Sequence, residues 1–486
     1  MIKTTYSDAI LSGFDYLLEN YAEVFVLGQG LWSPWYVGNT MKNLYKLLFF
    51  AFLMACGSDE DSGNDNVINL PASISTNVSS LSFENTMVTQ VSDSQVLIIS
   101  AENTTSELNI SSPNGYEIST DNNSFSEDIS FVPEISNEIY VRFRPSDATN
   151  YYSTLVISSN DIGNNININL FGVGTPMIHN YQAFQNQALG YGGGFSQSAS
   201  QVFNLHDDLS NIQEIKMYLQ IDCPSTGCDD WDRFANVKVK DQSTGNWYEI
   251  ARYITPYWVG TQQLQRGLEF DVTDFKMLLK NSAELRIYIE NWTAKADIVS
   301  IDFDYIVGTP DYENYAISEV LNLHSNSISG VPYGVAHNVD LEKSIQIPSN
   351  SESIEFRTII SGWGHATPYD ADGRPCAEWC YRTHDIKING GNTYQHNMGP
   401  IGCAANPVSN QSPGNWMPDR AGWCPGMAVP VRMNSLDPSF GGSTISFEYD
   451  FEDWTSDGAG GNAFYAISTY IVVKSNSEIT AAIITD

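Results

Sequence analysis

The stretch IDFDYIV, at residues 301–307, alternates apolar and polar side chains and decides the fold class. A β-strand projects successive side chains to opposite faces of its sheet, so this alternation predicts a strand with one buried face. Similar stretches are ELRIYI (284–289), IEFRTII (354–360) and TISFEY (444–449). Long helical periodicity is absent from residues 176–486, and Pro and Gly punctuate the strand-like stretches. We therefore predict an antiparallel all-β scaffold that carries function on its loops.

The block before this scaffold, residues 68–175, has the pattern of a small β-sandwich. Short β-rich runs alternate with turn clusters, at 95–100, 139–143, 153–158 and 166–171. The segment that begins IYVRFRPSDATNYY resembles the last strands of immunoglobulin-like domains. The block contains no Lys, Cys, Trp or His, so we expect a spacer, stabilising or binding role there rather than catalysis.

The composition limits the class of partner. The chain has 486 residues, 57 acidic and 23 basic side chains, and a formal net charge of −34. This charge excludes a general nucleic-acid binder, because backbone phosphates require Lys and Arg. A hydrophobic fraction of 42% fits a globular protein. Many aromatic residues with few Lys residues favour an exported β protein.

The sequence MKNLYKLLFFAFLMAC, which ends at Cys56, has the pattern of a lipoprotein signal. A basic start precedes an apolar run that is too short to span a bilayer, and small residues precede the cysteine. We expect residues 41–55 to be a signal peptide and Cys56 to be lipidated, with residues 56–67 forming an acidic linker. Met41 is then the expected start of the protein, and residues 1–40 are an upstream extension.

This interpretation predicts a lipoprotein of the outer membrane or cell surface, with release from the surface as the alternative. Acyl chains and a flexible tether hold such a protein on a membrane without a transmembrane helix. The acidic run at residues 58–61 resembles a surface-export tag. The structural alternatives are a short buried helix for the apolar run and a plain solvated linker after it.

The other cysteines fall into three neighbouring pairs: Cys223 and Cys228, Cys376 and Cys380, and Cys403 and Cys424. An exported protein matures in an oxidising compartment, so disulfides are the expected state of these pairs. The first two pairs close short loops, and their value is to hold a tight turn and the side chains on it. A four-thiolate zinc site is the alternative.

Three loops combine carboxylates with tryptophan. Asp232 ends the sequence Asp-Asp-Trp-Asp after the first cysteine pair, and Glu290 lies two residues before Trp292. Glu378 lies beside Trp379 inside the second cysteine pair. Indole rings pack on the apolar face of a sugar while carboxylates accept hydrogen bonds from its hydroxyls. Carboxylates in unlike surroundings also perform acid–base catalysis. These loops therefore indicate a carbohydrate-active or carbohydrate-binding protein.

Three segments resemble the peptide:N-glycosidase F family: CDDWDRFANVKVK (228–240), SGWGHATPYDADGRPCAEWCYRTH (361–384) and NQSPGNWMPDRAGWCPGMAVP (410–430). The similarity runs from about residue 180 to the C-terminus. It implies two antiparallel jelly-roll domains, at 176–310 and 311–486, with the active site between them. The implied reaction hydrolyses the amide bond between a glycosylated asparagine and the innermost N-acetylglucosamine. Asparagine becomes aspartate, and the glycan leaves as a glycosylamine.

The resemblance also implies the residues of the site. Asp232 matches the principal catalytic aspartate, with Glu378 and Glu290 as supporting acids. Asn291 stands where the family usually has Thr, and we expect it to modulate activity. The residues that match substrate-binding positions are Arg233, Trp292, Trp363, His365, Trp379, Arg420, Trp423, Ile254 and Ile328. No metal or cofactor is expected, the substrates are N-glycosylated proteins or glycopeptides, and the chain is expected to be a monomer.

The mechanism that we expect uses the three acids together. Asp232 assists proton transfer at the amide, Glu378 orients or activates a water, and Glu290 completes the hydrogen-bonded set. Arg233 or Arg420 stabilises charge on the amide oxygen. Two alternatives remain: a non-catalytic glycan-binding lipoprotein, and a glycoside hydrolase that cuts within the chitobiose core.

Overall fold

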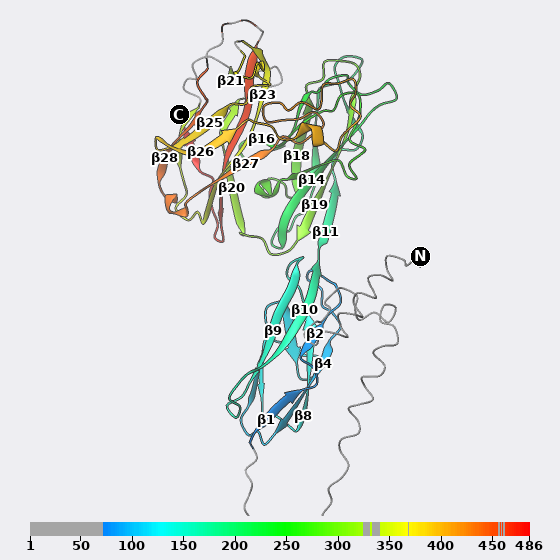
Figure 1. Ribbon diagram of the computed structural model, residues 1–486, viewed down its shortest axis with the longest axis vertical. Coiled ribbons are helices and arrows are strands. Elements are labelled where there is room, and N and C mark those ends of the chain that lie inside the picture. The colour runs from blue at the N-terminus through cyan, green and yellow to red at the C-terminus, as the bar shows by residue number, and fades with distance from the viewer. Residues whose placement is uncertain are drawn as a thin grey trace, which may run out of the picture. The chain divides into compact units, whose positions relative to one another are not determined.

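The computed structural model describes residues 71–323, 331–332, 341–367, 369–454, 457, 459 and 462–486. The upstream extension, signal peptide, Cys56 and acidic linker lie outside the described residues, and so does Ile328. Strands make up nearly all the regular structure of these described residues (Figure 1). Among the described residues, the helices are single 3₁₀ turns, and none is long and apolar enough to cross a membrane.

The N-terminal block forms two sheets around one core. The first sheet has the order β1 (Ser73–Thr76), β4 (Gln95–Glu102), β8 (Ser136–Phe143) and β6 (Tyr116–Ser119). The second has the order β2 (Ser80–Ser82), β10 (Ile166–Thr175), β9 (Asn150–Ser158), β5 (Leu108–Ser111) and β7 (Asp128–Phe131), with β3 (Thr86–Met87) against the end of β10. β2 and β3 run parallel to β10, and the other pairs are antiparallel.

The four predicted strand runs of this block are confirmed, because they lie in β4, β8, β9 and β10. Alternation produces the core: Ile139, Val141 and Phe143 on β8 are fully buried, while the residues between them are partly exposed. The assignment to the immunoglobulin-like class and the predicted boundaries at 68 and 175 stay predictions.

The first jelly roll consists of two antiparallel sheets that share a core. One sheet has the order β11 (Met177–Gln182), β19 (Asp297–Val307), β14 (Ile212–Asp222) and β17 (Leu268–Asp271), with β12 (Gln187–Leu189) also on β19. The other has the order β13 (Ser198–Asn204), β18 (Ser282–Ile289), β15 (Phe234–Lys240) and β16 (Trp247–Ile254). A 3₁₀ turn, η2 (Thr273–Phe275), packs beside them. Figure 1 shows β11, β14 and β19 side by side.

The stretch that decided the fold class behaves as predicted. It forms the second half of β19, where Ile301, Phe303 and Tyr305 are fully buried and Asp302 and Asp304 alternate with them. Asp304 is also largely buried, and its carboxylate is paired with Arg266.

The second jelly roll repeats this plan. Its first sheet has the order β20 (Asn314–Leu323), β29 (Ala463–Ser475), β23 (Ser353–Ala366) and β24 (Cys376–Ala377), with β21 (Val331–Pro332) on β29 and β27 (Val431–Leu436) on β23. Its second has the order β26 (Gly391–Asn397), β25 (Thr383–Ile388), β28 (Thr444–Asp450), β22 (Glu342–Gln346) and β30 (Ile483–Thr485). Two 3₁₀ turns, η3 (Cys403–Ala405) and η4 (Pro438–Phe440), lie in its loops. The all-β architecture with two antiparallel jelly rolls is confirmed.

A buried ion pair joins the two jelly rolls. Glu249 and Arg252 on β16 are fully buried and 2.8 Å apart (Oε2–Nη2). Arg252 Nη1 donates to Ser361 Oγ at 3.0 Å and to the Ala466 carbonyl at 2.7 Å, both in the second jelly roll. Ser468 Oγ donates to Glu249 Oε2 at 2.6 Å. A buried pair is tolerated only where further hydrogen bonds satisfy both charges, so this network fixes how the jelly rolls meet.

A backbone connection runs beside the ion pair. The Ile254 N–H donates to the Met427 carbonyl at 3.0 Å, and the Val429 N–H donates to the Arg252 carbonyl at 2.9 Å. The segment that follows Arg420 is therefore held along the end of β16. These two hydrogen bonds hold Met427 and Val429 beside the end of β16, at the edge of the first jelly roll.

Candidate active site

Asp232 lies two residues before β15, on a turn that follows the Cys223–Cys228 disulfide. Thr255, just after the paired strand β16, fixes this turn. The Arg233 N–H donates to Thr255 Oγ1 at 2.8 Å, and that hydroxyl donates to the Trp231 carbonyl at 3.1 Å. The carboxylate is consequently carried by a turn bound to its own sheet, which is the rigidity a catalytic group needs.

Glu290 lies at the same edge of the same sheet. It directly follows β18, and its N–H donates to the Phe234 carbonyl at 2.9 Å. β18 and β15 are antiparallel neighbours, with Ile289 opposite Ala235. The end of one strand and the start of the other therefore lie together, which places Glu290 near Asp232 and Arg233.

Glu378 comes from the second jelly roll, inside the Cys376–Cys380 disulfide ring. Its N–H donates to the Gly364 carbonyl at 3.0 Å, and its carbonyl accepts from the Ala421 N–H at 2.6 Å. The ring is thus tied to β23 on one side and to the segment of Arg420 on the other.

Arg420 links the acids of the two jelly rolls. Its Nη2 donates to Asp232 Oδ2 at 3.2 Å, and its Nε lies 3.9 Å from Glu378 Oε1. Its guanidinium carbon lies 4.5 Å from the ring centroid of Trp379 and 5.2 Å from that of Trp423. Aromatic faces on a cation stabilise a buried charge. Arg420 is only 1% exposed, so it serves the site from behind the acids.

Burial shifts the pKa of two of the acids. It raises the pKa of Asp232 to about 6; the charge of Glu378 adds to this rise, and Arg420 and a hydrogen bond from Tyr257 oppose it. Burial also raises the pKa of Glu290 to about 7, and Arg233 opposes that rise. Oε1 of Glu290 is buried and has no hydrogen-bond partner in the described structure. Both groups can therefore exchange a proton near neutral pH.

His365 stands beside Glu378 and has two competing partners. Its Nε2 accepts the indole N–H of Trp379 at 3.0 Å and lies 3.5 Å from Glu378 Oε2. The nitrogen can accept from Trp379 only when it is unprotonated, and it can donate to Glu378 only when it is protonated. The hydrogen bond that protonated His365 donates to Glu378 raises the pKa of His365, so acidification favours the ion pair.

Two further buried acids support the turn of Asp232, and sequence analysis assigned them no role. Asp229, 1% exposed, accepts from Arg233 Nε at 2.6 Å. Asp297 is fully buried, and its Oδ2 accepts from Asn291 Nδ2 at 3.1 Å. Asp229 belongs to an acidic run that could have drawn attention to it. The sequence around Asp297 has no motif that would point to a role, because only the fold brings this residue under the site.

The remaining predicted binding residues divide into two groups. Trp292 is 46% exposed, and His365, Trp363 and Trp379 are at least partly exposed. Ile254 and Trp423 are buried, and their predicted contact with substrate stays a prediction. Ile254 is fully buried, and Trp423 is 1% exposed and donates its indole N–H to the Gly362 carbonyl at 2.6 Å. Trp423 stacks on Trp363 with ring centroids 4.3 Å apart, and Ile254 lies in the same small apolar cluster, so Trp423 and Ile254 support the partly exposed Trp363 from behind.

The six described cysteines form the three expected disulfides: Cys223–Cys228, Cys376–Cys380 and Cys403–Cys424. The thiolate zinc alternative is therefore wrong for these cysteines. Asp419 lies next to the third disulfide in a grouping with metal-like spacing. Its Oδ1 already accepts from the N–H groups of Ile401, Gly402 and Cys403, so it closes a loop.

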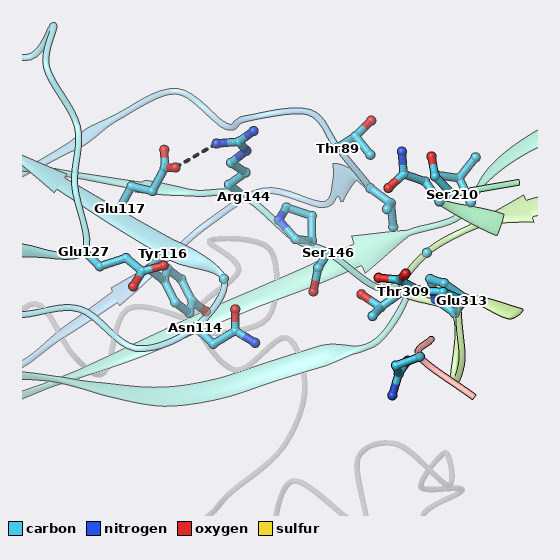
Figure 2. Close-up of a pocket in the computed structure, with 18 residues that line it drawn as sticks. Thr89, Asn114, Tyr116, Glu117, Glu127, Arg144, Ser146, Ser210, Thr309 and Glu313 are labelled. Carbon is cyan, nitrogen blue, oxygen red and sulfur yellow. Dashed lines mark hydrogen bonds and ion pairs between the residues drawn. The ribbon is translucent and has the colours of Figure 1, made fainter. Parts of the chain in front are cut away.

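A hollow of about 560 Å³ lies elsewhere, lined by residues of the N-terminal sandwich and of the first jelly roll, together with Glu313 and Asn476 (Figure 2). It contains the ion pair of Glu117 and Arg144, which are 2.9 Å apart. Asp232, Glu290 and Glu378 do not line it, so it is separate from the candidate site.

The fold and the acids together define a hydrolytic enzyme whose site lies where two jelly rolls meet. A family model for the C-terminal domain of peptide-N-glycosidase F matches residues 333–472. The curated peptide-N(4)-(N-acetyl-beta-D-glucosaminyl)asparagine amidase F of Elizabethkingia miricola is 55% identical over 307 residues, which are 63% of this chain and 87% of that protein. The chain belongs to the peptide-N-glycosidase F family.

Solved structures agree with this assignment. The structure of PNGase F, a glycosylasparaginase from Flavobacterium meningosepticum, is 55% identical, with a TM-score of 0.63. The match covers 64% of this chain and 100% of that one. A crystal structure of peptide-N(4)-(N-acetyl-beta-D-glucosaminyl) asparagine amidase gives the same identity and TM-score.

Proposed function

We propose that this protein is an amidase that releases N-glycans from glycoproteins and glycopeptides. It hydrolyses the bond between the asparagine side chain and the innermost N-acetylglucosamine. The observation that carries the proposal is the convergence of Asp232 and Glu378, from different jelly rolls, on Arg420. Supporting it, the curated relative with 55% identity is named for this reaction.

The reaction replaces a carbon–nitrogen bond with a carbon–oxygen bond. Water attacks the side-chain carbonyl carbon of asparagine, and the nitrogen leaves with the glycan as a glycosylamine. Asp232, whose pKa is raised to about 6, assists proton transfer to the amide nitrogen as that nitrogen leaves. Glu378 is held by backbone bonds on both sides and orients the water, and Glu290 completes the set.

Arg420 stabilises the developing oxyanion through its charge, from behind the acids, and Arg233, whose side chain is 19% exposed, is the donor that the substrate can reach. Arg233 donates from Nε to Asp229 at 2.6 Å. Nε of Arg420 has no hydrogen-bond partner in the described structure and lies 3.9 Å from Glu378 Oε1. A preorganised charged donor in a dry site stabilises an oxyanion strongly. The proposed hydrolysis uses the three acids, the arginines and water.

The mass of an N-glycopeptide after incubation tests the proposal. Conversion of asparagine to aspartate is expected. A peptide that keeps one N-acetylglucosamine would instead show glycosidic cleavage, and an unchanged peptide that co-elutes with the protein would show a binder. The variant Asp232→Asn, with its folding checked by thermal unfolding, should lose activity by about 10²–10⁴-fold.

We propose that the protein is exported and anchored by lipid on Cys56. The basic start, short apolar run and small residues before Cys56 support this. Metabolic labelling with a fatty acid should mark the wild type and leave Cys56→Ala unlabelled. Equal labelling of both proteins would remove the proposal.

We also propose that the protein acts as a monomer. Both sides of the site are supplied by jelly rolls of the same chain, so the arrangement of the acids needs no second copy. Light scattering coupled to size exclusion should give the mass of one chain at assay concentration. A dimer mass under those conditions would contradict this.

A further inference from the structure

Three exposed aromatic rings gather beside Glu290. Tyr191 is 53% exposed, Trp292 is 46% exposed and Phe195 is 39% exposed. The rings of Tyr191 and Trp292 have centroids 5.2 Å apart. Large apolar groups left in water next to a polar site mark a binding surface. Trp292 is expected to meet the substrate, but Tyr191 and Phe195 have no part in the chemistry.

The loop that carries Tyr191 and Phe195 is held in place. The Tyr191 N–H donates to the Thr293 carbonyl at 2.8 Å, and the Gly190 N–H donates to the Ser196 carbonyl at 3.1 Å. A Cβ on Gly190 would lie 3.3 Å from Ala296, so the loop packs closely on the segment that follows Trp292. The two rings are therefore presented by a fixed loop rather than by a free one.

A groove of about 300 Å³ opens beside these rings. Tyr191, Phe195 and Tyr288 supply its aromatic walls, and Ser196, Gln197 and Ser198 supply polar groups. Gln197 Nε2 donates to the Asn291 carbonyl at 2.7 Å, which joins the groove to the segment of Glu290. None of the residues that line the groove is charged.

We propose that this groove is a subsite for a neutral sugar of the N-glycan beyond the chitobiose core. The proposal rests on the amidase function above. A pyranose ring packs its C–H face on Tyr191 and Phe195 and directs hydroxyls to the serines and Gln197. The absence of charge from the lining selects a neutral hexose over a sialic acid or a phosphorylated sugar. Because Tyr191 in the groove contacts Trp292 at the site, a glycan bound at the site extends into the groove.

The test compares two substrates on one peptide, one with an oligomannose glycan and one with only the chitobiose core. In the wild type, kcat/KM should be higher for the longer glycan. Tyr191→Ala and Phe195→Ala should each lower the long-to-short ratio by about 2–13-fold, as expected for the loss of one aromatic contact. Tyr191→Phe keeps the ring and should keep the ratio. Tyr152→Ala is the matched control, since Tyr152 is 71% exposed and also packs on an aromatic ring, Phe171.

Titration of the free oligomannose glycan and free chitobiose into the wild type, followed by tryptophan fluorescence, separates this inference from the proposed function. Tighter binding of the longer glycan, lost in Phe195→Ala, supports the subsite even if no amide is cleaved. Equal affinities for both glycans overturn it. Losses in kcat/KM that follow peptide length rather than glycan length also overturn it, and assign the groove to the peptide. Equal losses on both substrates show a structural role only.

Discussion

Arg420 donates a 3.2 Å hydrogen bond from Nη2 to Oδ2 of Asp232, across the boundary between the two jelly rolls. The residues are 188 positions apart in the chain. The bond places a fixed positive charge behind an acid whose pKa burial raises to about 6. The titration of the proposed catalytic acid therefore depends on how the jelly rolls meet.

Removing the charge of Arg420 should move the pH profile. Burial and Glu378 raise the pKa of Asp232, and Arg420 opposes them, so Arg420→Met should raise this pKa further. We expect the limb of the kcat/KM profile that Asp232 sets to move up by about 1–3 pH units. Arg420→Lys keeps a cation and should shift it less. If the pH profile of kcat/KM does not move in a folded Arg420→Met protein, Arg420 does not control the pKa of Asp232.

Asp297→Asn should stabilise the protein at alkaline pH. Burial raises the pKa of Asp297 from 3.8 to about 7, so the folded state holds a proton that the unfolded state releases in this range. This contribution is present below about pH 4 and is lost as the pH rises through about 7. We expect about 1–3 kcal/mol of added unfolding free energy at pH 8, and little at pH 4, by urea denaturation.

Asp304→Asn is the matched control, with the opposite sign. Although burial opposes ionisation, hydrogen bonds from Arg266 and Asn180 hold the pKa of Asp304 below its ordinary value of 3.8. Its stabilising contribution is present above that value and is lost on acidification, so Asp304→Asn should be less stable than the wild type at neutral pH. The same sign for both variants would show that side-chain packing, not charge, causes the effects.

The two disulfides of the second jelly roll should separate activity from stability. Cys376 and Cys380 are 4 positions apart and enclose Glu378, whereas Cys403 and Cys424 are 21 apart. Chain entropy gives about 2 kcal/mol for the short ring and about 3 kcal/mol for the long loop. Replacing the first pair by serines should mainly lower kcat, and replacing the second should mainly lower Tm. The reverse pattern would mean that the small ring does not position Glu378.

Asn291→Ala should loosen the segment between Glu290 and Asp297. The Asn291 amide donates to the Lys295 carbonyl at 2.7 Å and accepts from the Thr293 N–H at 2.8 Å. Buried groups left without partners cost about 1–3 kcal/mol each, so we expect that loss of stability and a reduced kcat. Asn291→Thr should lie between Ala and the wild type. Full activity and stability of the Ala variant would count against a positioning role.

Deletion of residues 57–175 should keep glycan release and lower thermal stability. The described site contacts come from residues after 175, which predicts an unchanged kcat. Val88 packs on the core of the first jelly roll, and the Thr309 N–H donates to Asp147 at 2.9 Å, which predicts a lower Tm. Kinetics and calorimetry on the same preparation test both. Loss of activity in a folded remainder would place the N-terminal block in the site.

The sequence by itself determined the strands and the chemistry of the loops. Alternation in residues 301–307 predicts one face of β19, because a strand sends neighbours to opposite sides. The neighbouring cysteine pairs predicted their own disulfides, since short spacing leaves few other partners. The loops of Asp232, Glu290 and Glu378 stood out because they combine carboxylates with tryptophan, and the family resemblance implied that these three acids are the catalytic ones. These patterns each lie within a short stretch of sequence, so they can be recognised without knowledge of the fold.

Only the tertiary structure decided what surrounds the acids. Asp297 and Arg420 reach the site through strand pairing and through the join at Glu249 and Arg252, which no local pattern encodes. Ile254 matches a family binding position, and the fold buries it completely in a small cluster with Ile359, Trp423 and Val429. A pKa near neutrality is likewise not a property of an aspartate in a motif. It arises because folding removes water from Asp232 and sets Arg420 and Glu378 against each other around it.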